Sequence, residues 1–216
     1  GDEGGNLQAI LRHVQEDDER TFNRILASLR RFDDSFHGIG YDEKRGRVNW
    51  LFDLGRIPAR LDEFPPDMVS DGLLRAAAIA LLSSMRYPPA FILVEEIENG
   101  INQKNLSGFI EWLRQSAGTC DSAERGYNTQ FLVTSHSPSV LREFYDHLDH
   151  VYFVRLQKQG YCSVVRDLNT SLTAFVDMGI VEGEYIDRNG KRLVRISPQE
   201  LTELWYSGVI GGEVKG

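Results

Sequence analysis

Two adjacent carboxylates follow an apolar segment near the middle of the chain. Residues 90–94 are continuously apolar, which is typical of a strand buried on both faces of a parallel sheet, and Glu95 and Glu96 come directly after them. Open α/β sheets bind ligands at the carboxyl ends of their strands. One carboxylate there could hold Mg²⁺ through water, and the other could activate an attacking water. The alternative is a strand that ends in an ordinary charged loop.

A second group of residues could bind phosphate at the start of a helix. Residues 69–75 read Val-Ser-Asp-Gly-Leu-Leu-Arg. Ser70 is a good N-cap, Asp71 complements the helix dipole, and Gly72 allows a partner to approach the backbone closely. A helix N-terminus with a hydroxyl and a glycine can bind an anion. The simpler interpretation is a capped helix without a ligand.

A histidine follows the second apolar segment, residues 130–134. His136 is flanked by the hydroxyl side chains of Thr134, Ser135 and Ser137. Such a histidine can donate a hydrogen bond to a phosphate oxygen or to an activated water. It could also be a loop histidine beside a helix cap. The order of the three groups, with ordinary α/β spacing between them, favours a shared site.

The elements that would position these residues alternate between strands and helices, which predicts an α/β fold with a mainly parallel sheet flanked by helices. The sequence predicts two amphipathic helices within 7–29, short strands within 38–60, a helix over 71–86, buried strands at 90–94 and 130–134, a helix over 103–116, a loop at 121–128, a helix from 138, paired strands at 150–155 and 161–166, and a short helix over 198–205.

The composition excludes several classes of protein. The 216 residues are 41% hydrophobic and carry a net charge of -8, which suits one large domain or two small ones and argues against a dedicated nucleic-acid coat, although a local basic face is not excluded. Cys120 and Cys162 have no metal-ligand spacing, no signal peptide is present, and no apolar run could span a bilayer. A cytoplasmic protein without membrane contact is expected. Gly1 in place of Met is expected of an interior stretch or of a trimmed chain.

The motif series resembles the second half of ABC-type ATPases, specifically the RecF-like and overcoming-lysogenization-defect-like AAA ATPases of bacteria. Residues 69–75 resemble the signature motif, residues 91–102 resemble Walker B with the D-loop, and residues 133–138 resemble the switch-histidine motif. Residues 4–12 and 201–212 are also similar to these proteins. The resemblance therefore covers nearly the whole chain and implies a P-loop NTPase fold.

The resemblance implies roles for residues on two sides of a site for ATP and Mg²⁺. Glu95 would bind Mg²⁺ through water, Glu96 would be the general base, and His136 would contact the γ-phosphate. Ser70 and Gly72 of the signature motif would lie at the interface of a homodimer and reach the γ-phosphate of the nucleotide held by a second subunit. Asn99 and Gly100 of the D-loop would lie at the same dimer interface.

The chain departs from the family pattern around the D-loop. Ile97 replaces a proline, Asn102 and Gln103 replace a His-Pro pair, and Leu73 stands where a small polar residue is common. These changes weaken the D-loop assignment and leave Glu95, Glu96 and His136 unaffected.

The larger departure is that the chain contains no G-x-x-x-x-G-K-[ST] phosphate loop, and Gly190-Lys191-Arg192 is not a substitute. In the family this loop lies in an upstream N-terminal lobe. The segment alone is expected to bind ATP poorly and to hydrolyse it hardly at all. The expected divisions are a helical and short-strand region at 1–66, the ATPase core at 67–156, and a strand and helix extension at 157–216.

Two features invite other interpretations. Residues 180–187 resemble the first element of a Toprim nuclease, but Asp187 falls one residue late; a turn between short strands is expected instead. Lys191, Arg192 and Arg195 are expected on a solvated strand face.

The resemblance implies a nucleotide-dependent dimer clamp in DNA repair or anti-phage defence, with DNA or a partner nuclease or effector as further partners. The alternative is a non-hydrolysing module that uses the same surface to dimerise or to dock an effector.

Overall fold

The computed structural model describes residues 6–43, 46–85, 88–117, 129–157 and 162–210. The chain divides into two compact units, Gly1–Thr134 and Ser135–Gly216. The predicted loop at 121–128 lies outside the described residues.

The first unit is organised around its second helix. Helices α1 (Leu7–Asp17) and α2 (Glu19–Phe32) meet at Asp18, whose carboxylate accepts a hydrogen bond from the Thr21 amide at 3.0 Å and caps α2. Helix α2 contacts α1, the strand that follows it and two later helices, α3 and α4. Apolar residues recur at helical spacing along α2, and their burial explains these contacts: Phe22, Ile25, Leu26 and Leu29.

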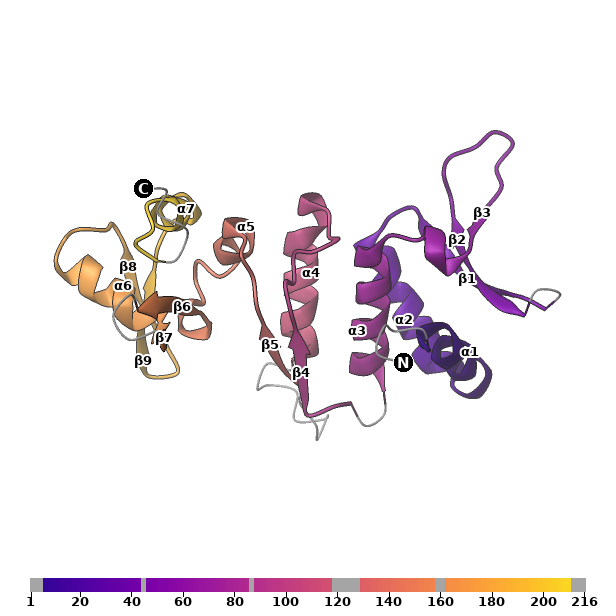
Figure 1. Ribbon diagram of the computed structural model, residues 1–216, viewed down its shortest axis with the longest axis horizontal. Helices are drawn as coiled ribbons and strands as arrows, with labels where there is room; N and C mark the ends of the chain where they lie inside the picture. Colours follow the sequence, from indigo (N-terminus) through magenta and orange to yellow (C-terminus); the bar gives the residue numbers. More distant parts are fainter. Residues whose placement is uncertain (1–5, 44–45, 86–87, 118–128, 158–161, 211–216) are drawn as a thin grey trace. The chain divides into compact units, whose positions relative to one another are not determined.

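The short strands predicted after these helices form an antiparallel sheet in the order β1 (Phe36–Asp42), β2 (Arg47–Phe52) and β3 (Asp62–Phe64) (Figure 1). Trp50 is fully buried, and its indole N–H donates to the Gln8 side chain at 3.3 Å, which joins β2 to α1. A 3-10 turn, η1 (Pro66–Met68), leads to α3 (Asp71–Ser84).

The elements that carry the two glutamates follow α3. Strand β4 (Phe91–Val94) pairs in parallel with β5 (Gln130–Val133), and α4 (Gln103–Ser116) connects them (Figure 1). The bounds of α4 match the predicted helix. Asn102 caps it by accepting a hydrogen bond from the Lys104 amide at 3.0 Å, which gives this departure from the family pattern a structural role.

The prediction that the first buried strand is covered on both faces is wrong for β4. Phe91 and Leu93 are 54% and 55% exposed, and Leu132 on the same face of β5 is 52% exposed, whereas Ile92 is buried. The reason is that no described element of the first unit covers this face. Among the described residues, parallel pairing is confined to β4 and β5, and the other strand pairs are antiparallel. The mainly parallel sheet is therefore not found in the described part of the chain.

The second unit combines two antiparallel hairpins with short helices. Its elements are α5 (Pro138–Arg142), η2 (Leu148–His150), β6 (Tyr152–Gln157), β7 (Cys162–Asp167), α6 (Leu168–Asp177), β8 (Glu184–Arg188), β9 (Lys191–Arg195) and α7 (Pro198–Tyr206). Their core is aliphatic and includes Leu148, Leu172, Val194 and Leu201. Helix α6 was not predicted from the sequence.

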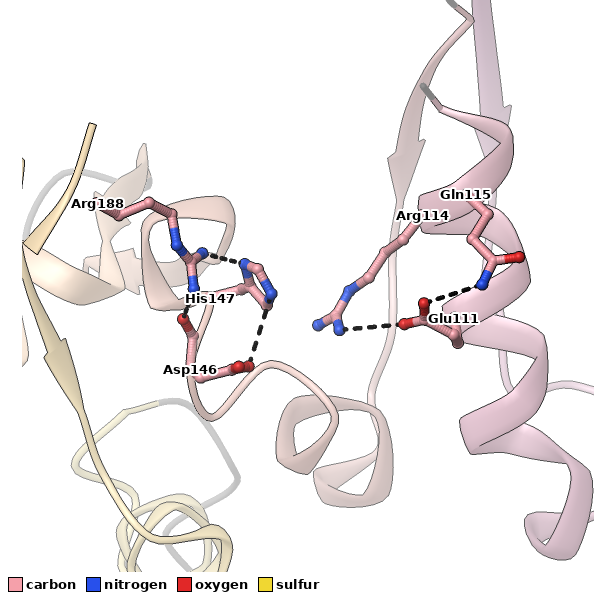
Figure 2. Close-up of polar contacts among 6 residues, drawn as sticks. All are labelled: Glu111, Arg114, Gln115, Asp146, His147 and Arg188. Atoms are coloured by element: carbon pink, nitrogen blue, oxygen red, sulfur yellow. Dashed lines mark hydrogen bonds and ion pairs between the residues drawn. The ribbon is translucent and has the colours of Figure 1, made fainter. Parts of the chain in front are cut away.

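Arg188 ties the second hairpin of this unit to the turn before η2. Its guanidinium contacts the His147 ring and donates to the Asp146 carbonyl at 3.0 Å, as Figure 2 shows. The same figure shows the polar face of α4 in the first unit, where Gln115 donates to Glu111 at 3.1 Å. On β9, Lys191, Arg192 and Arg195 are exposed, as predicted for a solvated strand face.

Candidate functional site

The backbone of Glu96 has an unusual conformation where the chain leaves β4. Its φ angle is 46°, in the left-handed region that non-glycine residues seldom adopt. Such a conformation costs about 1–3 kcal/mol and persists only where the surrounding structure holds it. Residues of this kind concentrate at functional sites, so the conformation marks Glu96 independently of any motif.

Neighbouring groups hold the backbone of Glu96 on both sides. The Glu96 amide donates to the Thr134 hydroxyl at 3.0 Å, and the Ile97 amide donates to the Thr134 carbonyl at 3.0 Å. On the other side, Arg75 Nη1 donates to the carbonyls of Glu95 at 3.2 Å and Glu96 at 3.1 Å. The family's proline at position 97 would have no N–H for the bond to Thr134, so Ile97 adds an anchor.

The side chain of Glu96 is oriented by the turn that follows it. The Asn99 amide donates to the Glu96 carbonyl at 2.9 Å, and Asn99 Nδ2 donates to Glu96 Oε2. The Glu96 side chain is exposed. A carboxylate fixed in this way can accept a proton from a water placed at the carboxyl end of β4, which is the requirement for a general base.

The N-terminus of α3 lies against the same turn. Ser70 caps α3 by accepting a hydrogen bond from the Leu73 amide at 3.3 Å, and it is exposed. A Cβ atom on Gly72 would lie 2.0 Å from the Gly100 carbonyl oxygen, so the two backbones touch and only glycine fits at Gly72. Gly100 has a φ of +73° and lies in the left-handed region.

The structure therefore brings most of the predicted site residues into one chain of contacts within the first unit. The α3 end contributes Ser70 and Gly72, and the turn after β4 contributes Glu95, Glu96, Asn99 and Gly100. His136 is exposed and belongs to the second unit, where it follows Thr134 by two residues.

The sequence motifs predict no role for Arg75 and no contact between Thr134 and Glu96. Arg75 and Thr134 both lie inside the quoted motifs. Their hydrogen-bond partners could not be predicted, because a hydrogen bond to a main-chain group 21 or 38 residues away has no signature in residue type.

The carboxylates fit Mg²⁺ only if the ion takes most of its ligands from elsewhere. Within the described ranges, no group of three or more His, Cys, Asp or Glu side chains could hold a metal ion. Mg²⁺ in nucleotide sites is usually bound by one or two carboxylates together with water and phosphate oxygens. Glu95, exposed at the end of β4, meets that requirement.

Solved structures of SMC ATPase heads are similar to this chain. The head from Pyrococcus furiosus, with an extended coiled coil and bound to the C-terminal domain of ScpA, is 14% identical with a TM-score of 0.51, over 78% of this chain and 40% of that chain. The Thermotoga maritima head is 15% identical with a TM-score of 0.42, over 74% and 51%. A third structure, from work on ATP-driven dimerization and DNA-stimulated activation of SMC ATPases, is 14% identical with a TM-score of 0.48, over 74% and 93%.

At these identities the likeness concerns the fold alone, and the Pyrococcus furiosus head is the comparison that carries it. The chain spans less than two thirds of that head and of the Thermotoga maritima head. The fold is that of a P-loop NTPase.

The family follows from a second comparison. The model described as "AAA domain, putative AbiEii toxin, Type IV TA system" matches residues 8–142, more than half of the chain, and the chain belongs to this family. No curated protein matches it significantly. None of the described helices is long and apolar enough to cross a membrane.

Proposed function

We propose that this chain is the catalytic C-terminal half of a RecF-like or overcoming-lysogenization-defect-like ATPase that acts as a nucleotide-dependent dimer clamp. Glu95 binds Mg²⁺ through water, Glu96 is the general base, and His136 contacts the γ-phosphate. The ATPase core spans residues 67–156, between the regions 1–66 and 157–216. Bound ATP with Mg²⁺ supplies the reacting phosphate and the cation that offsets its charge.

The observation that carries the proposal is the left-handed backbone conformation of Glu96 and the contacts that hold it. Its left-handed backbone is held by Thr134 and Arg75, and Asn99 binds its carboxylate. A residue that merely ended a strand would need none of these contacts. Fixing the carboxylate lowers the cost of aligning it with the attacking water, since little reorganisation remains for the moment of reaction.

The second half of the proposal concerns the dimer. Ser70 and Gly72 reach the γ-phosphate bound by a second subunit, and Asn99 and Gly100 line the seam. The exposed Ser70 hydroxyl and the α3 N-terminus suit an anion, because the first amides of a helix carry partial positive charge. The contact between Gly72 and Gly100 supports this role, since it keeps the two segments together within one subunit.

The chain is proposed to need an upstream lobe that supplies the phosphate loop. The sequence contains no such loop. The apolar face formed by Phe91, Leu93 and Leu132 also supports a missing covering element, because burial of such a face stabilises a sheet. In the complete protein β4 and β5 would then belong to a larger, mainly parallel sheet, and the segment alone would be inactive.

The cellular role is proposed from family membership. The family description names a putative toxin of a type IV toxin–antitoxin system. A cytoplasmic clamp that couples ATP binding to DNA or to a partner nuclease or effector, in DNA repair or anti-phage defence, is consistent with that description and with an ABC-type site.

The test uses a longer polypeptide that includes an upstream phosphate loop. Steady-state ATP hydrolysis is expected there and not in the 216-residue segment. Activity in the segment equal to that of the longer polypeptide would contradict the requirement for the upstream lobe. Absence of ATP hydrolysis in both would favour the non-hydrolysing docking module.

A further inference from the structure

Arg75 links helix α3 to the two carbonyls at the end of β4. The residue is half-buried in the second turn of α3, and its Nη1 donates to Glu95 O at 3.2 Å and to Glu96 O at 3.1 Å. Within the described part of the chain Arg75 forms no ion pair with a carboxylate. Its charge is therefore directed at main-chain oxygens, and hydrogen bonds from a charged donor are stronger than those from a neutral one.

The two carbonyls that Arg75 binds flank the φ and ψ angles of Glu96. If Glu96 relaxed to an ordinary negative φ, the peptide planes on either side of it would turn and at least one of these bonds would break. The carboxylate would also move relative to Asn99, which binds it. The two hydrogen bonds from the Arg75 guanidinium therefore fix the orientation of the Glu96 side chain.

We propose that Arg75 is a positioning residue that keeps Glu96 in its catalytic orientation and makes that orientation depend on α3. The inference rests on the proposed role of Glu96 as the base. In this role Arg75 acts on the backbone of Glu96 and not on the nucleotide. It lies five residues after Ser70 on the same helix, so the element that carries Ser70 toward a second subunit's nucleotide also holds the base of its own site. A shift of α3 on dimerisation would therefore reach Glu96 through Arg75.

The test compares Arg75→Ala with Arg75→Lys in the longer polypeptide that includes the upstream phosphate loop. Arg75→Ala is expected to lower kcat by about 10–100-fold, since a displacement of about 1 Å at a reacting group can cost 10²-fold. The KM for ATP is expected to stay within about twofold, because a positioning residue affects the orientation of the base and not nucleotide binding. Arg75→Lys is expected to recover part of kcat, since it restores a charged donor at this position.

Arg24→Ala is the matched control. Arg24 also donates from its guanidinium to a main-chain carbonyl of α3, that of Ser84 at 3.0 Å, at the opposite end of the helix from Glu96. This variant is expected to retain wild-type kcat. Equal kcat in Arg75→Ala and Arg24→Ala would overturn the proposal, and so would a loss in Arg75→Ala that appears only as a higher KM.

Two further measurements separate this inference from the proposed function. In single-turnover reactions, Arg75→Ala is expected to cost less than twofold in a Glu96→Gln background, because its effect passes through Glu96; an undiminished loss there would overturn it. Hydrogen exchange over residues 95–101 is expected to accelerate in Arg75→Ala and not in Arg24→Ala, and unchanged exchange would also overturn it. Full activity of Glu96→Gln, with accelerated exchange in Arg75→Ala, would refute the base and leave the structural link standing.

Discussion

Glu96 and Asn189 have nearly the same backbone conformation for opposite reasons. They are the non-glycine residues with positive φ among those described, at 46° and 54°. Asn189 precedes Gly190, with a φ of +74°, in the two-residue turn between β8 and β9. Asn-Gly is the preferred pair for such a turn, since its twist matches that of the strands. Glu96 has neither a favourable residue type nor a hairpin, and side chains from other elements hold it instead.

The comparison separates geometry that the local sequence accounts for from geometry that the tertiary structure imposes. The turn at Asn189 follows from two residues and the strands beside them. The conformation of Glu96 depends on Arg75, Thr134 and Asn99, each of which forms a hydrogen bond with it. Strain kept in this way at an exposed carboxylate is what a stability–activity trade-off would leave at a functional site.

The largest effect on stability is expected from a substitution that forces α3 away from the turn after β4. Gly72→Ala is expected to lower the free energy of unfolding by about 1–3 kcal/mol, because the new Cβ would lie 2.0 Å from the Gly100 oxygen and the backbone must shift. Gly108→Ala in α4 is the control. A Cβ there meets nothing within 4 Å, so the free energy of unfolding of this variant, measured in urea, is expected to rise by up to about 1 kcal/mol. A tolerated Gly72→Ala would show that the contact is loose.

A reciprocal exchange tests whether Glu96 is strained. Glu96→Asn is expected to raise the free energy of unfolding by about 0.5–1 kcal/mol relative to Glu96→Gln, since asparagine adopts the left-handed conformation more readily. Both variants lose the carboxylate, and the hydrogen bond that the glutamine oxygen can still accept from Asn99 works against the expected difference. Equal stability of the two variants in urea unfolding would remove the claim of strain.

The opposite substitution tests the hairpin. Asn189→Glu is expected to lower the free energy of unfolding by about 0.5–1 kcal/mol, because glutamate is unfavourable at positive φ and no side chain is arranged to hold it there. Asn189→Gly is the control and is expected to change stability little, since glycine accepts this conformation. A glutamate at 189 that cost nothing would mean that residue type is unimportant at both turns.

The smallest effect is expected at the cap of α2, away from both turns. Hydrogen bonds from the Thr21 amide and hydroxyl lower the pKa of Asp18 below its usual 3.8. The stability that the ionised cap contributes is therefore present above pH 3.8 and is lost as the pH falls through the lowered pKa. Asp18→Ala is expected to reduce Tm slightly at pH 7, with a difference from wild type that shrinks in acid. A constant difference across this range would contradict the charge-dependent part.

Much of the fold could be predicted because it is encoded locally. The period of α2, the Asn102 cap of α4 and the apolar run of β4 all lie within a few residues of the structure they specify. The exposed face of β4 could not be predicted, because apolar composition does not reveal which element covers a strand. The Asn189-Gly190 pair could have predicted the last hairpin, since it is a standard hairpin signal.

The candidate site divides in the same way. Glu95, Glu96 and the glycine of the α3 end were visible from residue type and order. The contacts that hold the Glu96 backbone could not be predicted, because the partner of its amide is Thr134 and the partner of the two carbonyls is Arg75, both on distant segments. His136 keeps its predicted role as a proposal.

The most direct test of the central claim is ATP hydrolysis by Glu96→Gln in the longer polypeptide with its phosphate loop, measured together with size by light scattering in the presence of ATP and Mg²⁺. Loss of the base is expected to lower kcat by about 10²–10⁴-fold while ATP binding persists, so the variant should accumulate as a nucleotide-bound dimer. Undiminished hydrolysis would contradict the assignment of Glu96 as the base, and a persistent monomer would contradict the role of Ser70 across the dimer.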